Sequence, residues 1–223
     1  MSSKAITRVT VLNGGPSVER EVSLVSGSEI ASALRGEGYI VSIIDADQNL
    51  ASEIIASDPD VVFNALHGRW GEDGCVQGLL EWMQIPYTHS GVYSSALAMD
   101  KEKTKDIYRS VGLPVASSML VSKADILHSH PMPAPYVIKP YNEGSSVGVY
   151  IVNIGDEPII SIKEELPDIL MVEEFIPGFE LTVTVLDGNA LTVTNIITDG
   201  WYDFDAKYES GGSHHEIPAN LPK

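Results

Sequence analysis

The sequence has 223 residues, is 43% hydrophobic, and carries a formal net charge of −17 from 31 acidic and 14 basic residues. That length suffices for one or two buried cores, and the acidic balance disfavours nucleic acid and anionic membrane surfaces as partners. The single cysteine, Cys75, cannot form an internal disulfide and is expected to be a small buried apolar residue, while the lack of a signal core or bilayer-length apolar run predicts a cytoplasmic protein.

The first hundred residues alternate strand and helix patterns. Strands are expected at residues 6–12, 39–44 and 60–66, and helices at 19–35, 51–56 and 74–84. Repeated units of this kind predict an open parallel sheet covered by helices. Ligands bind such sheets at the carboxyl ends of the strands. Two candidate features lie there: the Gly14-Gly15 turn that leads to Glu19, and the segment after the third strand that contains His67.

The pattern changes near Ala98. Asp100 can cap a helix that runs from Lys101 to Val111, on which the later cations, Lys103, Lys105 and Arg109, are expected at the surface. Short strands are then expected at residues 115–121, 135–139, 147–152, 169–175, 181–186 and 191–197. This is an α+β pattern, so the chain is divided here into an N-terminal α/β domain (1–97), a central subdomain (98–180) and the start of a further subdomain (181–223).

Two details of the last segment matter below. Asp187-Gly188 is a strong signal for a hairpin turn between two strands. The residues from Gly211 onward, which include His214 and His215, are expected to form a loop. A metal site at the two histidines is not expected, because no further ligand residue completes it.

Three segments could carry chemistry. In Glu143-Gly144-Ser145-Ser146-Val147-Gly148, two glycines and successive N–H and hydroxyl groups could cradle phosphate oxygens, with Lys139 as a nearby cation. An ordinary turn is the alternative. The segment 171–178 could meet a purine edge through Glu173, or it could be an edge strand with exposed acids. The polar and aromatic segment 202–208, taken alone, is a surface loop.

Taken together, and in this order, the segments resemble the D-alanine–D-alanine ligases of the ATP-grasp superfamily. The resemblance runs along the whole chain. It is carried by Gly14-Gly15-Pro16-Ser17-Val18-Glu19-Arg20-Glu21-Val22-Ser23, Ala65-Leu66-His67-Gly68-Arg69, Gly71-Glu72-Asp73-Gly74, Gln77-Gly78, Pro86-Tyr87-Thr88, Met99-Asp100-Lys101, Lys139-Pro140, Glu143-Gly144-Ser145-Ser146-Val147-Gly148 and Asp205-Ala206-Lys207-Tyr208.

The resemblance implies an open parallel sheet followed by an ATP-grasp domain, incomplete within these residues. It also implies a reaction for peptidoglycan precursor synthesis. ATP phosphorylates the carboxylate of one D-alanine, the amine of a second D-alanine attacks the acyl phosphate, and phosphate leaves. Such chemistry requires cations at the γ-phosphate, a pocket for two small zwitterions, and exclusion of water. The partners implied are ATP, D-alanine and a second copy of the chain, since family members usually dimerise through the N-terminal domain.

The resemblance also assigns ATP-binding residues. Lys101 and Lys139 are expected at the ATP phosphates, and Lys207 at the γ-phosphate. Glu173 is expected at the adenine amino group and Glu180 at the ribose. The remaining ATP-binding positions are backbone contacts at Glu174 and Ile176 and the loop residues Glu143, Ser145 and Ser146.

The D-alanine site is assigned to Glu19, His67, Ser145 and Tyr208. Glu19 is expected to face the substrate ammonium, although an acid at a helix start also has a purely structural explanation. His67 is expected near the substrate carboxyl group or the transferred phosphoryl group, against a structural role. Glu19, Ser145 and Tyr208 would form a hydrogen-bonded triad that orients substrate and fixes a closing loop. Tyr208 in place of phenylalanine favours an amine nucleophile over a hydroxyl.

Two departures from the family pattern matter. Tyr141-Asn142 replaces the commoner Ser-Arg before the glycine–serine loop. The Arg-x-Asp and Glu-x-Asn motifs that bind two Mg²⁺ (or Mn²⁺) ions in the family do not occur between Tyr208 and Lys223, so the metal ligands are expected beyond Lys223. These 223 residues alone are therefore expected to be inactive or nearly so. The alternatives are a non-catalytic ATP- or D-alanine-binding remnant and another ATP-grasp carboxylate–amine ligase.

Overall fold

The structure is a computed structural model that describes residues 7–157, 166–208 and 211–221. The chain forms two compact units. Unit 1 comprises residues 1–113 and 142–144, and unit 2 comprises residues 114–141 and 145–223. The domain boundaries expected near residues 97 and 180 stay predictions, because a division of the chain into compact units does not locate the boundary between two domains.

Unit 1 contains a parallel three-stranded sheet in the order β2-β1-β3. The strands are β1 (Arg8–Asn13), β2 (Ile40–Asp45) and β3 (Val61–Asn64). The helices are α1 (Arg20–Gly36), α2 (Leu50–Ser57), α3 (Cys75–Trp82), α4 (Val92–Met99) and α5 (Lys101–Ser110). The expected parallel sheet is confirmed.

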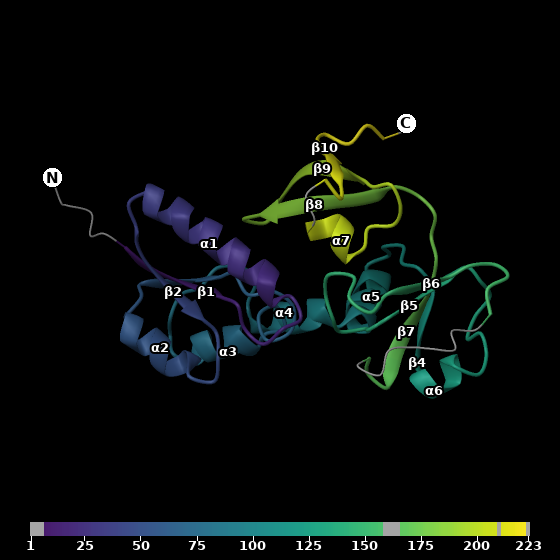
Figure 1. Ribbon diagram of the computed structural model, residues 1–223, viewed down its shortest axis with the longest axis horizontal. Helices are drawn as coiled ribbons and strands as arrows, with labels where there is room; N and C mark the ends of the chain where they lie inside the picture. Colours follow the sequence, from purple (N-terminus) through teal and green to yellow (C-terminus); the bar gives the residue numbers. More distant parts are fainter. Residues whose placement is uncertain (1–6, 158–165, 209–210, 222–223) are drawn as a thin grey trace. The chain divides into compact units, whose positions relative to one another are not determined.

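Helices cover both faces of this sheet, with α1 on one side and α2 and α3 on the other (Figure 1). Successive β1 residues face opposite sides: Val11 packs with Ala31 of α1, whereas Leu12 packs with Ile54 of α2 and Leu80 of α3. Because both faces of β1 are covered, even its polar residue Thr10 is buried, and the Thr10 hydroxyl lies 2.8 Å from the hydroxyl of Ser57 in α2.

Two expectations for unit 1 are wrong, and one helix was not predicted. Cys75 is exposed rather than buried, because it begins α3 while Val76 and Leu80 occupy the buried side of that helix. Lys105 is buried, with 7% of its surface exposed, and is not a surface cation. Helix α4 was not expected, since its small residues give little periodicity. The Asp100 cap is confirmed, because its carboxylate accepts a hydrogen bond from the Lys103 N–H at 3.1 Å.

Unit 2 contains an antiparallel four-stranded sheet in the order β4-β7-β5-β6. Its strands are β4 (Ser118–Ser122), β7 (Ile169–Glu174), β5 (Tyr136–Lys139) and β6 (Tyr150–Val152), and α6 (Lys123–Ile126) follows β4. The core of this sheet consists of buried side chains from α6 and three of the strands: Ile126, Tyr136, Ile138, Val152, Leu170 and Val172.

The second sheet of unit 2 has the order β10-β9-β8. It comprises β8 (Glu180–Leu186), β9 (Asn189–Ile197) and β10 (His214–Glu216). The expected hairpin turn is confirmed: Asp187 and Gly188 have φ values of 50° and 74°, the left-handed backbone of a two-residue hairpin turn.

The structure corrects two loop expectations in unit 2. Residues 214–216 form β10 instead of loop, because His214 and Glu216 pair with Ile197 and Asn195 of β9. A three-residue strand is too short to show an alternating pattern. The segment expected as a surface loop around residues 202–208 contains α7 (Phe204–Tyr208). The overall class is confirmed: a parallel α/β unit precedes antiparallel sheets.

Candidate active site

In unit 1, the turn after β1 delivers Glu19 to the start of α1. Gly14 and Gly15 have φ values of 65° and 78°, which side chains rarely adopt. The Glu19 backbone N–H donates to the Ser17 hydroxyl at 2.9 Å, and the Glu19 carbonyl accepts from the Ser23 N–H at 3.0 Å. The Glu19 side chain does not cap the helix, so helix capping does not explain its carboxylate.

An ion pair braces this turn. Arg20 and Asp45 are joined by two hydrogen bonds, and Asp45 at the end of β2 also accepts the Gly15 N–H at 3.3 Å. The pKa of Asp45 is lowered, chiefly by the hydrogen bond from Arg20. A side chain at position 14 would lie 2.2 Å from an Asp45 oxygen, so the turn requires glycine there.

Glu19 is almost fully buried, with 2% of its surface exposed. Two glycines leave room for its carboxylate: a Cβ atom would lie 2.2 Å from Glu19 Oε2 at position 68, and 3.0 Å from it at position 144. Glycines at these positions therefore let two backbone segments approach a buried acid, an arrangement that suits a small cationic group better than a surface role.

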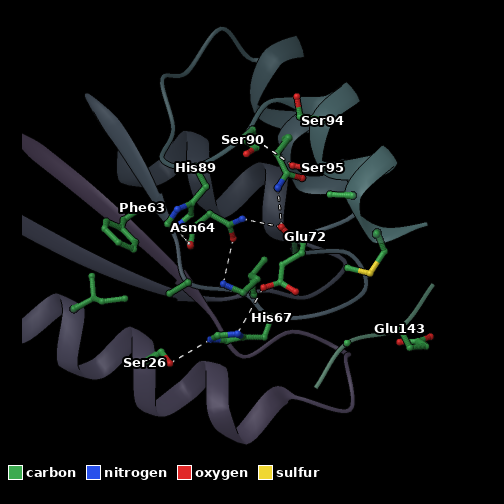
Figure 2. Close-up of a pocket in the computed structure, with 18 of the residues that line it drawn as sticks. Ser26, Phe63, Asn64, His67, Glu72, His89, Ser90, Ser94, Ser95 and Glu143 are labelled. Carbon is green, nitrogen blue, oxygen red and sulfur yellow. Dashed lines mark hydrogen bonds and ion pairs between the residues drawn. The ribbon is translucent and has the colours of Figure 1, made fainter. Parts of the chain in front are cut away.

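His67 follows β3 and belongs to a chain of polar contacts with Ser26 and Glu72 (Figure 2). Its Nε2 atom lies 3.2 Å from the Ser26 hydroxyl, and its Nδ1 atom lies 3.8 Å from Glu72 Oε1. The other oxygen of Glu72 accepts the Gly68 N–H at 2.8 Å. Burial raises the pKa of Glu72, while the Gly68 N–H opposes that shift. One nitrogen of the imidazole is thus within hydrogen-bond distance of Ser26, and Glu72 lies near the other, beyond that distance.

A cavity of about 710 Å³ lies beside this histidine and reaches Lys101, Glu143 and Gly144. Lys101, the first residue of α5, donates from its ammonium group to the Glu143 carbonyl oxygen. Burial raises the pKa of the Glu143 carboxyl group, and the nearby Glu19 adds to that effect. The cavity therefore combines one cation, Lys101, with two histidines, His67 and His89, and two acids, Glu72 and Glu143.

In unit 2, Lys139 ends β5 and forms an ion pair with Glu173 of β7. The two strands are neighbours in the sheet, with Val137 opposite Glu173 and Lys139 opposite Met171. The Lys139 and Glu173 side chains are 22% and 17% exposed, so both charges are largely withdrawn from water. Glu174 ends β7, Ile176 is 60% exposed, and Glu180 begins β8.

Ser145 and Ser146 have consecutive left-handed backbones, with φ values of 48° and 62°. Ser145 Oγ lies 2.6 Å from the Tyr208 hydroxyl. Lys207 Nζ donates to Ser146 Oγ at 2.8 Å, and that hydroxyl donates to the Tyr202 carbonyl at 3.1 Å. The Lys207 ammonium group also lies over the Tyr202 ring, 5.1 Å from its centroid. The serine loop is thus tied to α7 by hydroxyl and ammonium groups.

The predicted site residues divide between the two units. Unit 1 holds Glu19, His67, Lys101 and Glu143, and unit 2 holds Lys139, Ser145, Ser146, Glu173, Glu174, Ile176, Glu180, Lys207 and Tyr208. The structure brings Ser145 and Tyr208 together, while the triad with Glu19 stays a prediction. The sequence assigned no role to two polar residues of the site, Ser26 and Glu72. Ser26 lies in none of the matching segments, whereas Glu72 lies in Gly71-Glu72-Asp73-Gly74, which carries part of the resemblance.

Residues 7–157, 166–208 and 211–221 contain no group of three His, Cys, Asp or Glu side chains that could hold a metal ion. These residues do not fit a magnesium centre, so no step of the chemistry is derived through one. Lys223, beyond which the sequence places the expected metal ligands, lies outside the described residues, so that expectation stays a prediction.

No helix of the described residues is long and apolar enough to cross a membrane.

Comparisons with known proteins give a consistent family. The model of the D-Ala-D-Ala ligase N-terminus matches residues 46–90, and that of the C-terminus matches residues 107–223. The D-alanine–D-alanine ligase of Ruegeria pomeroyi is 64% identical over 222 residues, which cover all of this chain and 72% of the relative.

Solved structures agree. A crystal structure of D-alanine–D-alanine ligase from Bacillus anthracis is 34% identical, with a TM-score of 0.77, and the match covers 97% of this chain and 73% of that one. The structure of the same enzyme complexed with ATP is 32% identical, with a TM-score of 0.75 and coverage of 97% and 72%. The chain therefore belongs to the D-alanine–D-alanine ligase family, whose members are ATP-dependent ligases.

Proposed function

We propose that this chain binds ATP and D-alanine for the synthesis of D-alanyl-D-alanine. A carboxylate oxygen of the first D-alanine attacks the γ-phosphorus, and ADP leaves. The amine of the second D-alanine then attacks the acyl carbon, loses a proton and expels inorganic phosphate. The observation that carries the proposal is the buried Glu19 at the glycine turn, in a chain of this family, because it offers a desolvated anion for a small ammonium group.

In unit 1, Glu19 would bind the ammonium group of the first D-alanine. His67 would lie near its carboxylate, with the ring orientation set by Ser26 and Glu72. A histidine whose Nε2 atom already lies within hydrogen-bond distance of Ser26 is partly pre-organised, which lowers the reorganisation needed when substrate binds. Lys101 would meet the phosphates of ATP.

In unit 2, Lys139, Ser145, Ser146 and Lys207 would hold the ATP phosphates. Successive left-handed residues present backbone N–H groups to an anion, and the two lysines supply charge. Glu173 would accept a hydrogen bond from the adenine amino group, with Glu174 and Ile176 as backbone contacts and Glu180 at the ribose. Without nucleotide, Lys139 and Glu173 form an ion pair with each other. Bound ATP would replace this ion pair by two contacts, from its phosphates to Lys139 and from its adenine amino group to Glu173.

Closure over the acyl phosphate would involve α7. The Ser145–Tyr208 and Ser146–Lys207 contacts tie this helix to the serine loop, and a loop so held excludes water from a labile intermediate. Tyr208 would favour an amine over a hydroxyl group as the nucleophile. Magnesium or manganese would compensate phosphate charge in the whole reaction, from ligands other than the residues described.

Further proposals follow from the family. The protein would act in the cytoplasm, in the formation of peptidoglycan precursors, and two copies would associate through unit 1. Size-exclusion chromatography with light scattering tests the dimer. A monomer at micromolar concentration would contradict it.

One observation favours a second candidate function. Residues 7–157, 166–208 and 211–221 contain no group of metal-binding side chains, so these described residues would bind ATP or D-alanine with little or no turnover. The remaining alternative is a carboxylate–amine ligase with a different amino-acid specificity. Measuring ADP release with other amino acids tests it.

The decisive experiment measures ADP release with ATP, Mg²⁺ and D-alanine, with L-alanine as the control, beside calorimetric binding of a non-hydrolysable ATP analogue. Binding without D-alanine-dependent release supports the binding function for these residues. Release that depends on D-alanine and is lost in Glu19→Gln supports catalysis. Neither binding nor release would contradict both proposals.

A further inference from the structure

Unit 1 contains a second cavity, of about 1280 Å³, that the proposed reaction does not use. It lies at the carboxyl ends of β1 and β2, between the glycine turn, α2 and α3. This edge of a parallel sheet is where ligands bind. Its lining among the described residues includes neither Glu19 nor Lys101, which belong to the proposed catalytic machinery, although His67 borders both cavities.

The interior of this cavity is apolar. Ile44, Leu66 and Val76, which belong to the buried core between the sheet and α2 and α3, also line it. Leu50 and Leu79 extend the same surface. A concave apolar surface with a few polar groups at its edge is the usual form of a small-molecule site.

Trp70 at the edge of this cavity has an unusual backbone. Its φ of 74° lies in the left-handed region, where a bulky side chain is a clear outlier. The indole is nevertheless 46% exposed, and the Arg69 guanidinium lies over it, 4.7 Å from the ring centroid. The strain thus holds a half-exposed aromatic ring against a cavity, and strain of this kind is retained at ligand-binding sites.

The charges around the cavity indicate the sign of the ligand. Asp45, Asp47 and Glu53 line it, against Arg20 and Arg69. Arg20 is paired with Asp45, and Arg69 lies over Trp70. The Asp47 carboxylate accepts hydrogen bonds from the Asn49 backbone N–H at 2.6 Å and from the Asn49 side-chain amide at 3.3 Å, so its contacts are with neutral groups. The chain as a whole carries a charge of −17, which also attracts cations.

We propose that this cavity binds a small organic amine with a flat apolar body. The body packs on Trp70 and the apolar interior, and the ammonium group meets the carboxylates of Asp47 and Glu53. Aromatic faces and carboxylates together recognise such cations. Because the Asp45 carboxylate on the same wall accepts the Gly15 N–H, an occupied cavity adjoins the turn that carries Glu19.

The test is a fluorescence titration of the full chain carrying Trp82→Phe and Trp201→Phe, which leaves Trp70 as the reporter. The probe is 2-phenylethylamine, and phenylacetate is the control with the same ring and the opposite charge. We expect a saturable change with the amine, and an affinity at least about tenfold weaker for phenylacetate. No saturable response below about 10 mM, or equal responses to both probes, would overturn the proposal.

Variants separate binding from folding. Trp70→Gly should keep the fold, because glycine accepts the φ of 74° without strain, yet should weaken amine binding at least about tenfold by calorimetry. Glu53→Gln, a change at an exposed residue, should weaken the binding of 2-phenylethylamine and leave the binding of phenylacetate unchanged. The matched control is Trp82→Ala, whose indole is 89% exposed and lies outside the cavity lining. Unchanged amine affinity in both Trp70→Gly and Glu53→Gln would reject the site.

Discussion

The two sheets of unit 2 differ sharply in burial, although both are antiparallel and rich in aliphatic residues. In β7, Leu170, Met171 and Val172 are fully buried. In β8, every residue is exposed, with Val183 at 41% and Val185 at 65%. The difference comes from what covers each strand: β7 shares a buried core with α6, whereas no residue of β8 belongs to a buried core among the described residues, and most of its partner β9 is exposed too.

This contrast shows that strand composition and strand burial are separate properties. A run of β-branched and aliphatic residues indicates a strand, but its contribution to stability depends on what covers it. Within the described residues of unit 2, α6 packs on the four-stranded sheet, whereas the sheet β10-β9-β8 presents apolar side chains to solvent. The following predictions test that difference, from the largest effect to the smallest.

The largest effect is expected from truncating a buried side chain of β5. Ile138→Ala should lower the free energy of unfolding by about 2–5 kcal/mol, because Ile138 is fully buried and leaves a cavity. Val185→Ala in β8 should change it by less than about 0.5 kcal/mol. Equilibrium urea unfolding followed by circular dichroism measures both. Equal losses would mean that β8 is covered in solution.

The second effect concerns charge. Glu173→Gln leaves the Lys139 ammonium group largely buried without its anion, and should cost about 1–2 kcal/mol, between the values for exposed and buried pairs. Glu180→Gln, at the exposed start of β8, is the matched control and should cost less than about 0.5 kcal/mol. Unfolding at low and high salt measures both. A Glu173→Gln variant as stable as the parent would show that the pair contributes nothing net.

The sequence predicted much of this arrangement. The parallel sheet of unit 1 and the hairpin at Asp187-Gly188 follow from local signals, namely apolar runs and a turn dipeptide. Strand β10 and the exposed Cys75 were not predicted, because pairing with β9 and the orientation of α3 are decided by tertiary packing. Position along a chain could not reveal that His67 lies beside Ser26 and Glu72 either, since this proximity depends on how the segments fold together.

The third prediction uses a tyrosine of the buried sheet. Tyr136 is fully buried, and its hydroxyl lies 2.8 Å from His130 Nδ1. Tyr136→Phe should cost about 1 kcal/mol at neutral pH through that lost hydrogen bond. Burial raises the pKa of Tyr136, so the neutral phenol is favoured in the folded state. Its stabilisation is therefore complete below the unfolded pKa of about 10 and is lost as pH rises through the folded pKa.

The pH dependence gives this prediction its control. The parent and Tyr136→Phe stabilities should converge above about pH 10, because phenylalanine does not titrate. Tyr93→Phe, with 78% of the tyrosine exposed, should match the parent at neutral pH. Urea unfolding across the pH range measures the difference. A constant difference between Tyr136→Phe and the parent from neutral to alkaline pH would contradict the assigned shift.

The smallest change in stability, and the sharpest test of the comparison, comes from the exposed face of β8. Replacing Val183 and Val185 together by threonine removes apolar surface while keeping β-branched strand formers. The free energy of unfolding should change by less than about 0.5 kcal/mol. Binding of the hydrophobic dye anilinonaphthalene sulfonate should fall, because exposed apolar surface is what such a dye detects.

Val172→Thr in β7 is the matched contrast, because the same change of residue type meets a fully buried site. It should destabilise the sheet by about 1–3 kcal/mol, since a hydroxyl is buried without a partner, and dye binding should rise as packing loosens. If the β8 double variant were the destabilised one, its valines would be packed in solution. Opposite dye responses at two valine sites of one unit would show that cover, and not composition, separates the two sheets.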